Sequence, residues 1–228
     1  MSDINDVRKR YAPYLIRENF LRSSKKRLWA CDGKFYLITF ELASCNLGGF
    51  FTNLGINFLW NKPCGGFEFY YPELRITSDN INHFSDAILY ESPDFEVAVH
   101  ETMQQLLLRI NDYKKLNNLD YLSDRLRNRR DLFWSCNQND CNMADFDLGV
   151  VQMLRGHIDE ARAIFQYNYD LPDGSAKECL QYCDSVESFK GYITQKVIEN
   201  RALYAAKYRY RLPVIDEIFK THMAPDEF

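Results

Sequence analysis

The sequence predicts an α+β fold: an N-terminal helix, an antiparallel meander of about four strands covered by helices, and an all-helical C-terminal region. Apolar residues alternate with other residues between positions 28 and 76, as in strands with one face on a core. Before and after that stretch they recur at spacings of three and four, as on one helix face. Aromatic residues make up 15% of the 228 residues, which supplies large side chains for such a core.

Two helices are predicted around the strands. Val7, Tyr11, Tyr14 and Leu15 share one helical face, and Pro13 predicts a kink or a restart there because proline lacks a backbone donor. Ser92 and Pro93 have the residue types of an N-cap and a first helical position. They precede an apolar stripe that we expect to cover the sheet: Phe95, Val99, Met103, Leu106, Ile110 and Tyr113.

The strands are expected in four runs. A short one spans 28–31, two longer ones span 36–42 and 52–60, and the last spans 67–76. The last run changes phase by one residue at Pro72, which predicts a bulge or a sheet edge.

The remaining sequence predicts helices only. Leu119, Leu122, Leu126 and Phe133 mark one helix, and the polar stretch 135–142 behind it suggests a boundary between two domains, 1–134 and 145–228. Further helices are expected at 148–154, 158–167 and 189–208. A short helix is also expected from Ser175, which has capping-box spacing to Glu178.

Two local patterns resemble known families. Glu18-Asn19-Phe20, then Leu28-Trp29, then Asn53-Leu54-Gly55-Ile56 resemble a bacterial family of unknown function with an Asn-x-Gly-Ile strand signature. That family usually has glycine where this chain has Asn19, and asparagine also tolerates the left-handed conformation. The resemblance covers the N-terminal half and implies an α+β fold with no established activity. Some relatives are thought to be immunity proteins, which bind and neutralise a toxin.

The second pattern resembles a single tetratricopeptide-like hairpin at 148–165. Gly149, Gly156, Ala161 and Phe165 have its spacing, but Gln152 stands where an aromatic residue is expected. A self-supporting array needs about three repeats, and no second copy is present. The hairpin is therefore either a partner-binding helical layer or ordinary helix packing.

The net charge and the number of cysteines limit the classes of function and the compartment that the sequence predicts. The net charge of −4 argues against a protein that coats nucleic acid generally. The N-terminus lacks a secretory pattern, and no apolar stretch approaches the ~20 residues of a membrane helix. Seven cysteines are an odd number for a disulfide framework, so we expect a cytoplasmic protein with reduced thiols and no membrane contact.

No arrangement of residues meets the first test for a catalytic site, and no cofactor or metal is predicted. Four cysteines have spacing that zinc could use, although buried free thiols give the same pattern: Cys136, Cys141, Cys179 and Cys183. The last two would lie on one face of a helix. Asp145 and Asp147 are best explained as charges at a helix N-terminus.

Two basic clusters are the candidate partner surface: Arg125, Arg127, Arg129 and Arg130, and Tyr208, Arg209 and Arg211. They fit an acidic protein partner or a phosphate backbone, and the favourable position of cations at a helix C-terminus explains them equally well. The sequence thus predicts a non-enzymatic protein that occludes a protein partner, as an immunity-type protein does. A nuclease-like hydrolase and a nucleic-acid-binding protein are the alternatives, and the oligomeric state is not predicted.

Overall fold

A computed structural model describes residues 3–23, 28–61, 71–75, 87–135, 141–169, 174–208, 212 and 218–219. The described residues form two compact units. Those within Met1–Lys114 and Val197–Ile218 form the first, here named the sheet unit. Those within Lys115–Lys196 and Phe219–Phe228 form the second, the helical unit.

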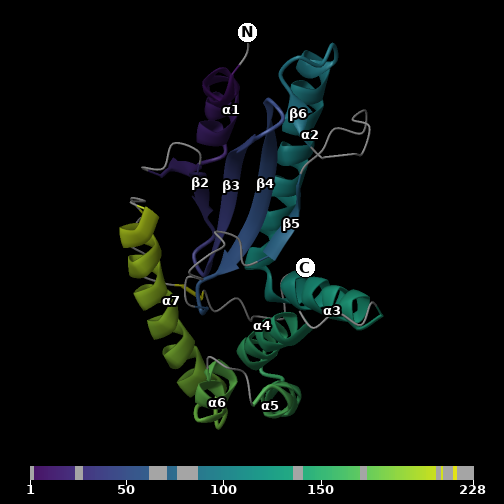
Figure 1. Ribbon diagram of the computed structural model, residues 1–228. Coiled ribbons are helices and arrows are strands. Elements are labelled where there is room, and N and C mark those ends of the chain that lie inside the picture. Colours follow the sequence, from purple (N-terminus) through teal and green to yellow (C-terminus); the bar gives the residue numbers. More distant parts are fainter. Residues whose placement is uncertain are drawn as a thin grey trace, which may run out of the picture. The chain divides into compact units, whose positions relative to one another are not determined.

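The sheet unit is built on an antiparallel sheet with the strand order β1-β2-β3-β4-β5, and β6 also pairs with β4. Its helices are α1 (Ile4–Arg17) and α2 (Phe95–Lys114). Its strands are β1 (Leu21–Arg22), β2 (Leu28–Asp32), β3 (Tyr36–Cys45), β4 (Gly49–Phe58), β5 (Tyr71–Arg75) and β6 (Ile88–Leu89). The predicted α+β fold is confirmed, with the N-terminal helix and the meander of β2 to β5 in the expected order (Figure 1).

Both helices cover one face of the sheet. The ring of Tyr11 in α1 stacks on Phe40 of β3 with centroids 5.8 Å apart. The hydroxyl of Tyr36 in β3 donates to the carbonyl of Tyr113 in α2 at 3.0 Å. All six residues of the predicted stripe on α2 are buried, which confirms that this helix covers the sheet.

The N-terminal helix differs from its prediction at Tyr14, and of the two alternatives for Pro13 the restart is wrong. Tyr14 is 44% exposed, because the buried stripe follows the spacing of four through Val7, Tyr11 and Leu15 and leaves Tyr14 beside it. Pro13 lies inside a continuous helix, so the helix does not restart there. After α1, Asn19 has a φ of 64°, the left-handed conformation that its residue type tolerates.

Besides β3, the strand β4 pairs with two strands, β5 and β6, and of these β6 was not predicted. The register between β4 and β5 shifts between Asn53 and Gly55, in agreement with the bulge or edge expected around Pro72. Nearer its start, β4 pairs with β6, and a Cβ on Gly49 would lie 2.3 Å from the carbonyl oxygen of Ile88. Glycine is therefore required for the two strands to approach.

The helical unit begins with a short 3₁₀ turn, η1 (Lys115–Asn117), followed by α3 (Leu119–Ser135), α4 (Cys141–Leu154), α5 (Ile158–Tyr167) and α6 (Ser175–Leu180). Residues 186–196 of α7 (Val186–Tyr208) also belong to it, and α7 from Val197 onward belongs to the sheet unit. The expected boundary at 135–144 falls between α3 and α4, which pack against each other inside the helical unit. The domain limits 1–134 and 145–228 stay a prediction.

Small residues bring α4 and α5 together. A Cβ on Gly149 would lie 2.7 Å from Cε1 of Phe165, and Gly156 turns the chain between the helices with a φ of 85°. The predicted capping box at Ser175 is wrong. The N-cap of α6 is Gly174 in the left-handed conformation, with no side-chain cap, so Ser175 is already the first helical residue. Among the described residues, no helix is both long and apolar enough to cross a membrane.

Candidate functional site

Arg127, one of the predicted basic residues, forms an ion pair. It lies on α3, and its Nη2 donates to both carboxylate oxygens of Glu160 in α5, at 2.6 and 2.9 Å. Arg125 lies on the same helix and also makes interactions. Arg209, Arg211 and the side chains of Arg129, Arg130 and Tyr208 fall outside the described residues. The arginine clusters as partner surfaces therefore stay a prediction.

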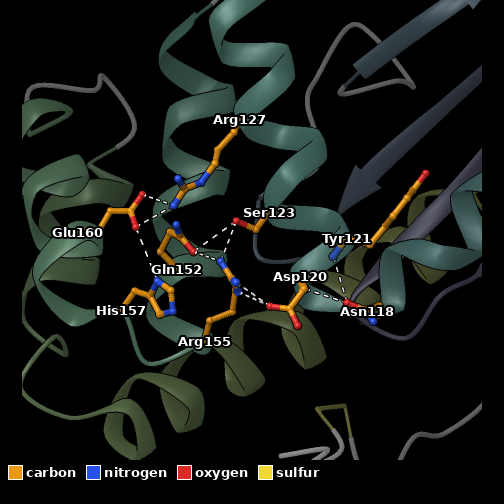
Figure 2. A network of polar contacts seen from close by, with 9 residues as sticks. All are labelled: Asn118, Asp120, Tyr121, Ser123, Arg127, Gln152, Arg155, His157 and Glu160. Atoms are coloured by element: carbon orange, nitrogen blue, oxygen red, sulfur yellow. Dashed lines mark hydrogen bonds and ion pairs between the residues drawn. The ribbon is translucent and has the colours of Figure 1, made fainter. Parts of the chain in front are cut away.

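Arg127 belongs to a polar network in the helical unit that joins α3, α4 and α5 (Figure 2). Arg155, just after α4, is its centre. The guanidinium donates from Nε to Oδ1 of Asp120 at 2.8 Å and from Nη1 to Oγ of Ser123 at 2.9 Å. Nη1 also donates to Oε1 of Gln152 at 2.7 Å. The network thus ties the helices together with charge-assisted hydrogen bonds.

Gln152, which stands where the tetratricopeptide-like pattern would have an aromatic residue, is buried in this network together with Ser123. Its side chain is fully buried, and its Oε1 accepts from Arg155 and from Ser123. Its Nε2 is not placed to hydrogen-bond to any described residue. The amide therefore serves as an acceptor for the Arg155 guanidinium inside the helical unit.

The carboxylate of Glu160 is stabilised in its charged form. Burial acts to raise its pKa, but the nearby Gln152 amide, the Arg127 guanidinium and His157 act in the opposite direction and leave the pKa below its usual value. Nδ1 of His157 lies 3.7 Å from Oε2 of Glu160. Because the folded-state pKa is lowered, this group stabilises the fold above its unfolded-state pKa, and that contribution is lost as the pH falls through the folded value.

A Glu160→Gln variant is therefore expected to be less stable than the wild type at about pH 7, by up to about 1 kcal/mol for a half-exposed pair. At about pH 3 the deficit is expected to shrink, because Glu160 is then protonated in the unfolded wild type and folding gains less from its charged form. Urea unfolding of both proteins at the two pH values measures this. An equal deficit at both values would contradict the ion-pair account.

The Asn-x-Gly-Ile signature forms a second polar cluster, in the sheet unit. Nδ2 of Asn53 donates to Oε2 of Glu41 at 3.2 Å, and Nδ2 of Asn57 donates to Oγ1 of Thr39 at 3.0 Å. These side chains lie on the sheet face opposite Phe40, and Glu41, Thr39 and Asn57 are buried. Asn53 of the signature and Asn57, which follows it directly, thus provide cross-strand partners for polar side chains of β3.

The prediction that Asp145 and Asp147 lie at the N-terminus of a helix is wrong. The helix α4 begins at Cys141, so both residues lie beyond its first turn. Asp145 is 4% exposed and Asp147 is fully buried, and both make interactions. The sequence pattern missed their burial because the start of α4 lies further upstream than the apolar run at 148–154 indicates.

The prediction that Cys179 and Cys183 lie on one face of the same helix is wrong. The helix α6 ends at Leu180, and the chain continues in tighter turns with bonds from residue i to i−3. Both thiols are free and buried, and Sγ of Cys183 donates to the carbonyl of Cys179 at 3.2 Å. Burial raises the pKa of Cys183. Within the described ranges, no three His, Cys, Asp or Glu side chains are placed to hold a metal ion.

Tyrosines and lysines gather around α6 at the surface of the helical unit. We name this set the α6 surface: Tyr169, Lys177, Glu178, Tyr182, Tyr192 and Lys196. The rings of Tyr182 and Tyr192 stack with centroids 4.2 Å apart. The Tyr192 hydroxyl and the Lys196 ammonium donate to Oε2 of Glu178 at 2.9 and 2.8 Å. Burial is the main factor that raises the pKa of Tyr192, so its hydroxyl remains a donor.

The other half of the α6 surface is a single cation–π contact. Nζ of Lys177 lies 5.7 Å from the ring centroid of Tyr169, which is 46% exposed. Tyr182 is 36% exposed, and Tyr167, two residues before Tyr169, is 68% exposed. None of these tyrosines was predicted from the sequence to lie at a binding surface. A usable signal existed for Tyr167, which lies two residues after Phe165, the last buried apolar residue of α5, and therefore on another side of the helix. Tyr169 follows the end of α5, and its exposure could not be predicted from helical spacing.

No protein-family model matches the chain, and no curated protein or solved structure matches it at a significant level. The resemblance of the N-terminal half to the family with the Asn-x-Gly-Ile signature therefore stays a prediction, as does the tetratricopeptide-like pattern at 148–165. What the structure defines is a class by architecture: an α+β protein whose antiparallel sheet unit is accompanied by a helical unit.

Proposed function

We propose that this chain is a cytoplasmic, non-enzymatic protein that binds and occludes a protein partner, with the helical unit supplying the contact surface. An immunity-type protein that neutralises a toxin acts in this way. The observation that carries the proposal is the exposed tyrosine set of the helical unit, Tyr167, Tyr169 and Tyr182. Tyrosine is enriched in protein interfaces and among the residues that dominate their binding energy.

The geometry of these tyrosines suits binding. A tyrosine ring offers a large, rigid contact area with few rotatable bonds, so little conformational entropy is lost when a partner covers it. Tyr182 is already held by its stacking on Tyr192, and Tyr169 by Lys177 above its ring. Such a preorganised surface spends less of its binding energy on ordering side chains.

The test is a rescue assay with the product of the neighbouring gene as the toxin. We expect the wild type to restore growth and to co-elute with that product. A variant with Tyr167→Ser, Tyr169→Ser and Tyr182→Ser is expected to bind at least about tenfold more weakly, which corresponds to about 1.4 kcal/mol. Binding is measured by calorimetry on the purified proteins.

The matched control changes exposed apolar residues of the sheet unit, Val97→Ser and Leu108→Ser on α2, which are 51% and 63% exposed. It is expected to rescue growth like the wild type, and circular dichroism checks that both variants are folded. A neighbouring product that is harmless, or a tyrosine variant that binds as tightly as the control, would overturn the proposal.

A further inference from the structure

We propose that the C-terminal end of α1 and the strand β1 bind single-stranded nucleic acid, with Arg17 and Arg22 contacting phosphates and Tyr14 stacking on a base. This is a further function of the sheet unit, and it does not rest on the proposed function. Residues 8–27 contain eight arginines and lysines but one acid, Glu18. The rest of the chain has more acids than bases, so positive charge is concentrated in this part of the sequence.

The two guanidiniums that carry the proposal are available to a ligand. Arg17 and Arg22 are exposed, and neither forms an ion pair with a described residue. The acid within this stretch, Glu18, already has a cationic partner, because its carboxylate pairs with the Lys114 ammonium at 2.5 Å. A guanidinium presents a planar set of donors that matches the oxygens of a phosphate.

Arg22 lies at the edge of the sheet, on the face that α1 covers. It stands opposite Trp29 in the register of β1 and β2, and Trp29 stands opposite Phe40 of β3. Side chains that stand directly opposite each other in antiparallel strands share one face, and Phe40 stacks on Tyr11 of α1. Cζ of Arg22 lies 5.6 Å from the ring centroid of Trp29. This contact restrains the guanidinium before any ligand binds.

Tyr14 supplies the part of the site that contacts a base. It is 44% exposed and lies three residues before Arg17 on α1. Residues three apart on a helix are neighbours, with Cβ atoms about 5–6 Å apart. An aromatic ring beside a cation suits a single strand, in which bases and phosphates alternate along the chain. The bases of a duplex are already stacked on one another, so Tyr14 favours a single strand.

Other polyanions fit this end of the sheet unit less well. A helix that lies in a membrane interface needs a free apolar face. The apolar face of α1 is used inside the sheet unit, where Val7, Tyr11 and Leu15 are fully buried. A run of Asp and Glu in a peptide offers carboxylates to the guanidiniums but no planar base to Tyr14. Anionic vesicles and an acidic peptide are therefore included as competing ligands in the test.

The test measures by anisotropy how a fluorescent oligothymidylate of about 12 nucleotides binds to the full chain. We expect binding, and we expect the affinity to fall steeply as salt rises from ~0.05 to ~0.2 M, since each neutralised phosphate releases counterions. Arg17→Glu combined with Arg22→Glu is expected to weaken binding at least about tenfold. Tyr14→Ser is expected to weaken it at least about fivefold, whereas Tyr14→Phe keeps the ring and the affinity.

The matched control is Lys177→Glu combined with Lys190→Glu in the helical unit, which changes the net charge by the same amount. It is expected to bind like the wild type, and circular dichroism checks that every variant is folded. The proposal is overturned by an absence of binding, by equal weakening in the control, or by tighter binding of a duplex of the same length. Equal competition by polyglutamate, or preferential binding to phosphatidylserine vesicles, would also overturn it.

Discussion

An Arg201→Ala variant is expected to lose about 3–5 kcal/mol of unfolding free energy, because it leaves a buried carboxylate without its cation. Nη1 and Nη2 of Arg201 donate to the two carboxylate oxygens of Asp32 at 2.6 and 2.7 Å. Nη1 also donates to the carbonyl of Lys34 at 2.9 Å. The side chains of Arg201 and Asp32 are only 8% and 14% exposed, so water cannot replace the lost partner fully.

Urea unfolding of the wild type and the variant measures this loss, with Lys9→Ala as the control. The Lys9 ammonium pairs with Asp6 at 3.4 Å on the surface, so its removal is expected to cost less than about 1 kcal/mol. Combining Arg201→Ala with Asp32→Asn is expected to cost less than the sum of the two single changes, since the buried charge is then gone. A loss for Arg201→Ala as small as that for Lys9→Ala would show that the pair does not anchor α7.

The second large effect is expected for Phe165→Ala, at about 3–5 kcal/mol for a buried phenylalanine. Phe165 is fully buried in the helical unit, with ring centroids 5.8 Å from Phe146 and 5.9 Å from Phe189. It also fills the space that Gly149 leaves open. Its removal would leave a cavity among α4, α5 and α7 that backbone helices cannot close easily.

Hydrogen exchange is the appropriate measurement, because a chain with two compact units need not unfold in one step. The opening free energy of the most protected amides in the helical unit is expected to fall by the same amount, about 3–5 kcal/mol. Gln166→Ala, at the exposed neighbouring position, is expected to change stability by less than about 0.5 kcal/mol. Equal effects of the two substitutions would mean that the ring of Phe165 is not part of the core.

The sheet and its covering helix could be predicted because their signals are local. Alternation at 36–42 and 52–60 gave β3 and β4, and the stripe from Phe95 to Tyr113 gave the buried face of α2. The two-residue strands β1 and β6 have no periodicity of their own. They exist through pairing with β2 and β4, which residue spacing cannot reveal.

The candidate site was harder to predict for a similar reason. Arg127 could be selected by residue type, but its pairing with Glu160 depends on how α3 and α5 meet. The α6 surface joins residues of α6 and α7 with residues that follow α5 and α6, and the tyrosines involved do not form one sequence pattern. The compact units likewise depend on long-range packing, which a polar stretch such as 135–142 does not encode.

The pairing of Arg201 with Asp32 has a consequence for biosynthesis. The two residues are 169 positions apart in the chain, yet both belong to the sheet unit. During translation Asp32 leaves the ribosome long before Arg201, its cationic partner, has been synthesised. The same holds for the carbonyl of Leu59, which accepts a hydrogen bond from Asn200. The sheet can form its strands early, but Asn200 and Arg201 are added only after Lys115–Lys196, the main part of the helical unit, have been synthesised.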